Sequence, residues 1–158
     1  MTQAFWPSRH KPFRLLRRRR AIGIQGWSGG VLEAVSHRSP RRDPVVAVVD
    51  DDEDVRTALD DMLKSLGYTA LLFETADVFL ASDVEDQIDC VISDIQMPGT
   101  SGLQLARHLQ PSDVPIILVT AFPTSEVEQQ AQAAGVRRLL IKPFDSGDLI
   151  AELDDLLA

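Results

Sequence analysis

The sequence predicts an α/β fold in which one parallel sheet carries helices on both faces. Short runs of β-branched and other apolar residues alternate five times with segments whose apolar residues recur at helical spacing. The connections are short, and right-handed crossovers between parallel strands place helices on both sides of the sheet. The expected architecture is therefore a flavodoxin-like, doubly wound (βα)5 three-layer sandwich with strand order 2-1-3-4-5.

The charge distribution divides the chain into a basic arm and an acidic domain. Residues 1–44 contain ten of the 16 basic residues but only two of the 24 acidic ones. This segment is rich in Arg, Gly and Ser and has no sustained hydrophobic period, so we expect it to be disordered. Residues 45–158 hold the other 22 acids and form the predicted domain. An acidic domain repels nucleic acid and attracts cations.

Several kinds of site and location are disfavoured by composition. The single cysteine, Cys90, lies in a predicted strand, so we expect a buried thiol and no intramolecular disulfide. The three histidines do not have the spacing of zinc ligands. No stretch resembles a signal peptide or a membrane span, which favours a cytoplasmic protein without membrane contact.

The first strand and the first helix have clear sequence signals. The run Val45–Val49 predicts a buried strand, and the acidic cluster Asp50–Asp54 follows it. The next segment is expected to be a helix that ends at Gly67. Its apolar residues, which share one helical face, are Val55, Leu59, Met62, Leu63 and Leu66.

The remaining elements repeat this alternation. The predicted strands are Tyr68–Phe73, Ile88–Ser93, Ile116–Val119 and Leu139–Ile141. Four further helices are predicted. The first begins at Thr75, the next two cover Leu103–Leu109 and Glu126–Ala134, and the last contains the apolar residues of Leu149–Leu157. The third strand is expected to be buried on both faces, and Pro98, Gly99 and Gly102 prevent its continuation beyond Asp94.

Polar residues directly follow four of the five strands. Asp50 and Asp51 follow the first, Asp94 the third, Thr120 the fourth and Lys142 the fifth. In the predicted order these side chains meet at one edge, and three carboxylates converge at the switch point between the first and third strands. Close carboxylates need a cation, and Mg²⁺ is the simplest one to take oxygen ligands. With the lysine and the hydroxyl, such a site suits an incoming phosphoryl group and a carboxylate nucleophile.

Four motifs at these strand ends, VVDDDEDVR, SDIQMPGTSGLQL, ILVTA and IKPF, occur in an order that resembles the CheY-like receiver domain of bacterial response regulators. The resemblance spans about residues 45–158. It implies that Asp94 is phosphorylated and that Asp51 and Asp94 ligate Mg²⁺ directly. It further implies supporting roles for five positions: the Gln96 main-chain carbonyl as a metal ligand, Asp50 as an acidic helper acting largely through water, Thr120 as the switch hydroxyl, Lys142 as the phosphate-binding cation, and Pro143 as a cis proline.

The resemblance also implies a class of partners. The phosphoryl donor would be a histidine kinase or a histidine phosphotransfer protein, and the phosphorylated domain would act on a downstream effector protein. It implies a signalling switch rather than an enzyme, with no direct binding of nucleic acid by the receiver. A dimer that forms on phosphorylation is compatible with this family.

Two positions depart from the family pattern. An aromatic residue usually stands three residues before the lysine and swings inward on phosphorylation, but this chain has Leu139 there. Two residues beyond Thr120 lies Phe122, an apolar side chain close to the path expected for an attacking water. No output module follows the predicted fifth helix within this sequence.

The same residues also allow alternatives to a receiver domain. In a phosphatase of the haloacid dehalogenase type, Asp50 would be the nucleophile and Asp52 the acid, but the threonine expected after that pair is missing. A receiver-like module that binds partners without phosphorylation is a further alternative, which Leu139 favours. A calcium loop on Asp50, Asp52 and Asp54 lacks its glycine, because Val55 occupies that position.

Overall fold

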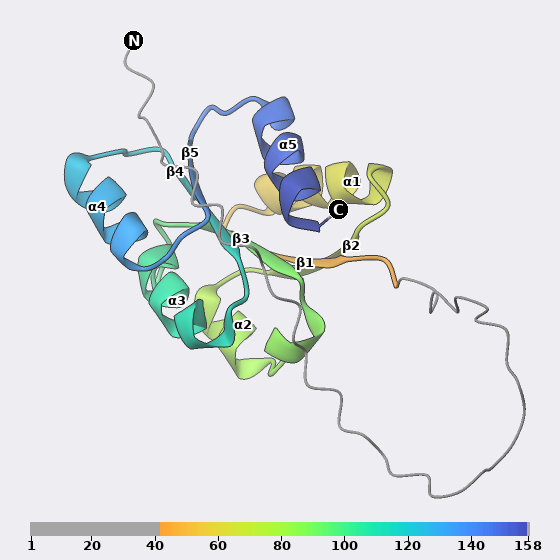
Figure 1. Cartoon of the computed structure of the whole chain (residues 1–158), viewed down its shortest axis with the longest axis horizontal. Coiled ribbons are helices and arrows are strands. Elements are labelled where there is room, and N and C mark those ends of the chain that lie inside the picture. Colours follow the sequence, from red (N-terminus) through yellow and green to blue (C-terminus); the bar gives the residue numbers. More distant parts are fainter. Residues whose placement is uncertain (1–41, 158) are drawn as a thin grey trace, which may run out of the picture. The chain divides into compact units, whose positions relative to one another are not determined.

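The computed structural model describes residues 42–157, which form a five-stranded sheet with helices on both faces (Figure 1). All strand pairs are parallel and the order is β2-β1-β3-β4-β5, which confirms the predicted fold. The strands are β1 (Val45–Val49), β2 (Thr69–Phe73), β3 (Cys90–Asp94), β4 (Ile116–Thr120) and β5 (Arg138–Ile141). The expected disorder covered residues 1–44. Residues 1–41 lie outside the described residues, and residues 42–44 belong to neither a helix nor a strand.

Each strand is followed by an α-helix, and four of the five helices begin at a capping side chain. Asp52, Thr75, Ser101 and Thr124 each accept a hydrogen bond from a main-chain amide in the first turn of a helix. Two short 3₁₀ turns, η1 (Glu85–Gln87) and η2 (Gln110–Ser112), were not predicted. The helices are α1 (Glu53–Ser65), α2 (Ala76–Ala81), α3 (Gly102–Leu109), α4 (Ser125–Ala133) and α5 (Ser146–Leu157).

Two hydrophobic layers hold the helices on the sheet. On one face, α1 and α5 pack against alternate residues of the central strands, while α2, α3 and α4 lie on the other face (Figure 1). β3 and β4 are buried along their whole length, as expected for central strands covered on both faces. The buried cluster that α1 and α5 form with the sheet consists of Val46, Val48, Leu59, Leu63, Cys90, Ile92, Ile117, Val119, Leu140, Leu149 and Leu153.

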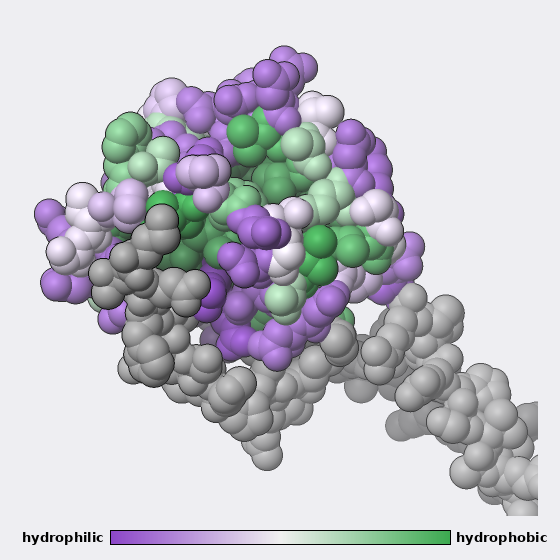
Figure 2. Space-filling view, turned by 90° about the horizontal axis from the view of Figure 1, so that it is seen from above, coloured by the Kyte–Doolittle hydropathy of each residue, from purple (hydrophilic) through white to green (hydrophobic). Residues whose placement is uncertain are grey.

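The surface is mainly polar. In Figure 2, hydrophilic residues form most of the outline and hydrophobic residues gather nearer the middle. Among residues 42–157, the large apolar side chains that are exposed are Leu72, Val78, Phe122 and Ile141. In this part of the chain, no helix combines the length and the hydrophobicity that a membrane span requires.

The third strand differs slightly from its prediction. It begins at Cys90, two residues later than predicted, although Ile88 is also buried. It extends one residue further than predicted, to Asp94, which pairs with Val119 of β4. Asp94 is therefore the last residue of a central strand. Cys90 is buried, which confirms the expected buried thiol, and burial raises the pKa of this thiol to about 12.

Gly102 allows the start of α3 to pack directly against the end of β3. Its amide donates to the Ile95 carbonyl over 3.1 Å. A methyl group added at Gly102 would overlap the Asp94 carbonyl oxygen and lie 3.0 Å from the carbonyl carbon. These are main-chain atoms of the strand end, so they cannot rotate away as a flexible side chain can.

We predict that Gly102→Ala lowers the free energy of unfolding by about 1–3 kcal/mol, because overlap with a packed backbone forces a shift of β3 or α3. Gly147→Ala is the matched control, since its added methyl group meets a side-chain oxygen of the exposed Asp145 at 3.0 Å and no main-chain atom of another element. Urea unfolding of both variants measures the difference. Equal stability of Gly102→Ala and the wild type would contradict the close packing described here.

Candidate functional site

Three carboxylates meet at the carboxyl edge of the sheet, where β1 and β3 lie side by side. Asp50 follows β1 directly and Asp94 ends β3; both are buried, whereas Asp51 is exposed. One carboxylate oxygen from each of the three lies within 4.8 Å of the others. The predicted convergence of Asp50, Asp51 and Asp94 is therefore present in the structure.

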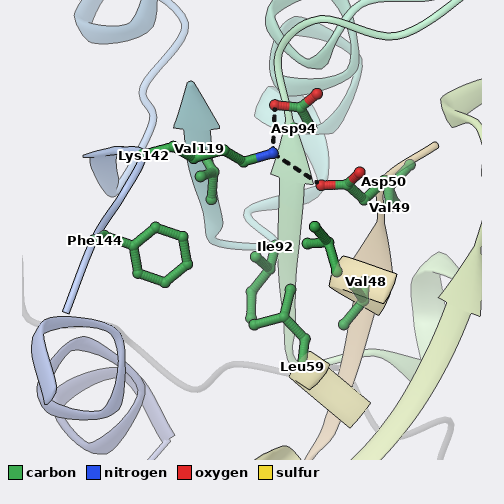
Figure 3. A pocket seen from close by; sticks show the side chains of 10 residues that line it. Val48, Val49, Asp50, Leu59, Ile92, Asp94, Val119, Lys142 and Phe144 are labelled. Atoms are coloured by element: carbon green, nitrogen blue, oxygen red, sulfur yellow. Dashed lines mark hydrogen bonds and ion pairs between the residues drawn. The ribbon is translucent and has the colours of Figure 1, made fainter. Parts of the chain in front are cut away.

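Lys142 reaches the two buried carboxylates from the end of β5 (Figure 3). Its Nζ lies 3.4 Å from Asp50 Oδ2 and 3.5 Å from Asp94 Oδ1. The bond between Lys142 and Pro143 is cis, as the resemblance implied. A single ammonium group thus faces two buried acids, and the third acid adds further negative charge.

The acidic site lies on an apolar floor, which sets the electrostatics of Asp94. A cavity of about 10 Å³ beneath the charged groups has the size of one water at most. Burial raises the pKa of Asp94 above its usual value; Lys142 opposes this effect and repulsion from Asp50 adds to it. The cavity is lined by Val48, Val49, Asp50, Val55, Leu59, Ile92, Asp94, Val119, Lys142 and Phe144 (Figure 3).

The ammonium group of Lys142 is stabilised in its charged form. Partial burial opposes the charge, but attraction to Asp50 and Asp94 outweighs it and raises the pKa of Lys142 above its usual value. Lys142 is therefore protonated throughout the physiological range, and the cation is permanent.

Thr120 is held by neighbours other than the carboxylates. It is fully buried at the end of β4, its hydroxyl donates to Gln96 Oε1 over 3.2 Å, and it accepts the Phe122 amide over 3.1 Å. A hydroxyl role at the site therefore requires exchange of the Gln96 bond. The predicted metal-ligand role of the Gln96 main-chain carbonyl stays a prediction.

The two departures from the family pattern have different surroundings. Leu139 is half-buried in β5 beside Leu118, so an aliphatic side chain fills the position of the usual aromatic. The Phe122 residue is 69% exposed. Its ring therefore extends largely into solvent, while its main chain is tied to Thr120.

Three contacts at the site were not predicted from the sequence. Arg56 Nη1 donates to the Asp50 carbonyl over 2.6 Å, and Phe144 forms part of the apolar floor. Asp77 accepts from the Thr100 hydroxyl at 2.6 Å and from its amide at 3.1 Å, which ties the loop after β3 to α2. These hydrogen bonds lower the pKa of Asp77. Only the position of Arg56 beside the acidic cluster could have signalled its role.

The surroundings of Asp52 count against a haloacid dehalogenase site. One oxygen of Asp52 caps α1 by accepting the amides of Asp54 at 2.9 Å and Val55 at 3.3 Å. The Asp52 amide in turn donates to Asp50 Oδ1 over 2.9 Å. Asp52 therefore serves as a helix cap, in place of the free acid that this alternative needs.

Comparison with known proteins agrees with this geometry. Residues 46–154 match the family model of the response regulator receiver domain. The chain is 32% identical over 114 residues to the transcriptional regulatory protein FixJ of Bradyrhizobium diazoefficiens, which covers 71% of this chain and 56% of FixJ. It spans about half the length of the first curated relatives that it matches.

Solved receiver structures have the same fold. A response regulator receiver protein from Pseudomonas putida superposes with a TM-score of 0.66 at 32% identity, covering 72% of this chain and 97% of that one. The chemotaxis protein CheY4 of Vibrio cholerae gives a TM-score of 0.67 at 26% identity, covering 73% and 99%. This chain therefore belongs to the response regulator receiver family, whose domains act as phosphorylation-controlled switches in two-component signalling.

Proposed function

We propose that Asp94 is the phosphoacceptor, with a histidine kinase or a histidine phosphotransfer protein as the donor. The position of its carboxylate carries this proposal. Asp94 ends a central strand, lies 3.5 Å from the Lys142 ammonium group, and shares the edge with two further acids. In such a site a carboxylate can act as a nucleophile while cations neutralise the incoming phosphoryl oxygens.

The donor set fits a hard divalent cation. Three carboxylate oxygens can approach one ion, and the exposed Asp51 leaves room for the waters that Mg²⁺ retains. We assign Asp51 and Asp94 as direct ligands, Asp50 as a helper that acts largely through water, and the Gln96 main-chain carbonyl as a further ligand. When bound, Mg²⁺ would neutralise the carboxylates and the phosphoryl oxygens.

The covalent step needs only groups of this chain and the donor. A carboxylate oxygen of Asp94 forms a bond to phosphorus while the bond between phosphorus and the donor's imidazole nitrogen breaks. The imidazole leaves with the electron pair of that bond and takes a proton from solvent. Lys142 pairs with the new charge, and Thr120 can donate to a phosphoryl oxygen once it has left Gln96.

The phosphorylated domain would act on an effector protein. Residues 45–158 hold 22 of the chain's acids, so direct binding of this domain to nucleic acid is disfavoured. A cytoplasmic location and a dimer that forms on phosphorylation are parts of the same proposal. The complete set of acids, hydroxyl and lysine argues against a module that works without phosphorylation.

We predict that acetyl phosphate with Mg²⁺ phosphorylates the wild type on Asp94 and that Asp94→Asn abolishes the modification, because the amide is not a nucleophile. Asp61→Asn, on the exposed surface of α1, is the control and should be modified like the wild type. Intact-mass measurement followed by peptide mapping locates the phosphate. A phosphate of normal yield on Asp94→Asn would rule out this assignment, and one on Asp50 would revive the phosphatase alternative.

We predict that Lys142→Met lowers the free energy of unfolding of the metal-free protein by about 1–3 kcal/mol at pH 7, because two buried carboxylates lose their cation. The stabilising pair needs ionised carboxylates. Because the folded pKa of Asp94 is raised, the difference between the proteins should shrink as the pH falls through that pKa. At alkaline pH the difference in stability should persist until Lys142 loses its proton. That loss occurs above the usual range for lysine, because the folded pKa of Lys142 is raised.

Chemical unfolding at several pH values in a chelating buffer measures this difference. Lys64→Met is the control, since Lys64 forms a surface pair with Asp60 over 2.6 Å and should change stability little at any pH. A loss that is equally large at pH 3 and pH 7 would show that Lys142 stabilises the fold by packing alone.

A further inference from the structure

Arg56 supplies a hydrogen bond where the β-ladder ends. The paired register of β1 and β2 stops at Val49 and Phe73, and the Asp50 amide donates to the Phe73 carbonyl over 3.1 Å. At the Asp50 carbonyl, Arg56 Nη1 donates from the first turns of α1 over 2.6 Å. The first helix is thereby tied to the main chain of the acidic loop.

The loop between β1 and α1 is closed by further short-range bonds. The Asp52 amide donates to Asp50 Oδ1, and Asp52 itself caps α1. Asp51 lies between these two anchored residues. Its own side chain is exposed, yet it belongs to the group of three carboxylates that can hold a metal ion.

We propose that Arg56 is a positioning residue for the cation site. A peptide unit is planar, so a bond that fixes the Asp50 carbonyl also fixes the amide and the Cα atom of Asp51. The position of that Cα atom limits the places that the Asp51 carboxylate can reach. Arg56 thus preorganises a metal ligand that it does not touch, in the way that groups behind a metal ligand orient it. The proposal rests on the Mg²⁺ binding included in the proposed function.

Charge and positioning predict opposite effects of removing Arg56. A guanidinium group near three carboxylates repels Mg²⁺, so its loss should tighten binding if its charge were its main influence. If Arg56 acts by holding the Asp50 carbonyl, its loss should weaken Mg²⁺ binding. The loop around Asp51 would then become ordered only when the ion binds, and this ordering would reduce the binding free energy. The sign of the change in affinity therefore separates the two effects.

The test is a Mg²⁺ titration of the unphosphorylated chain of 158 residues, followed by NMR. Arg56→Met keeps an unbranched apolar side chain and removes the donors. We expect it to raise the Kd for Mg²⁺ about ten-fold, the lower end of the loss seen when such supporting groups are removed. In the metal-free protein, the Asp52 amide should also exchange its hydrogen faster, since its bond to Asp50 lies in the loosened loop.

Arg42→Met is the matched control, because Arg42 also donates to a main-chain carbonyl, that of Gln87, over 3.1 Å, but beside the start of β1. It should leave the Mg²⁺ affinity unchanged. An unchanged or tighter Kd in Arg56→Met would overturn the proposal. Should that variant not fold, Arg56→Ala decides, since alanine also removes every side-chain donor to the Asp50 carbonyl, and a wild-type Kd would then overturn the proposal.

The outcomes also separate this proposal from the function on which it rests. A wild-type protein that binds no Mg²⁺ would contradict the proposed function. Normal binding by the wild type together with an unchanged Arg56→Met variant would contradict only the role of Arg56.

Discussion

The site depends on one ammonium group placed between two buried carboxylates. Lys142 lies 3.4 Å from Asp50 and 3.5 Å from Asp94, above a floor of apolar side chains. Burial without the lysine would strongly disfavour two negative charges so close together. With the lysine present, the two ionised carboxylates still leave an excess of negative charge, and Asp51 adds to it. The lysine thus offsets part of the repulsion between the acids, and the remaining negative charge supports the cation binding proposed above.

Two features of the fold produce this arrangement: the order of the strands and the hydrogen bonds that hold the loops. Because β1 and β3 are neighbours, Asp50 and Asp94 come together without any special loop. The loops are then fixed by side chains outside the acidic group: Arg56 holds the loop after β1, and Asp77 holds Thr100 after β3. Gly102 lets α3 approach the end of β3 closely. The sheet edge and the anchored loops thus hold the carboxylates in place, whereas the Thr120 hydroxyl would have to leave Gln96 to join them.

The sequence was sufficient to predict the sheet, its order and the residues that end its strands, because hydrophobic periodicity and turn residues are local signals. Asp50, Asp94, Thr120 and Lys142 could be placed at one edge for that reason. The bond from Thr120 to Gln96 and the tie between Asp77 and Thr100 could not be predicted, because they depend on side-chain directions across loops. The exposure of Phe122 likewise follows from the path of the β4–α4 loop, which no periodic pattern describes.

The charged form of Asp94 is disfavoured when no metal is bound, and a cation bound beside it would relieve that cost in free energy. A pH titration of the Asp94 side-chain carboxyl carbon by NMR measures this cost. In a chelating buffer we expect a pKa above that of an ordinary aspartate, since burial and Asp50 outweigh Lys142. Addition of Mg²⁺ should lower it. A metal-free pKa at or below the ordinary value, unchanged by Mg²⁺, would contradict this account.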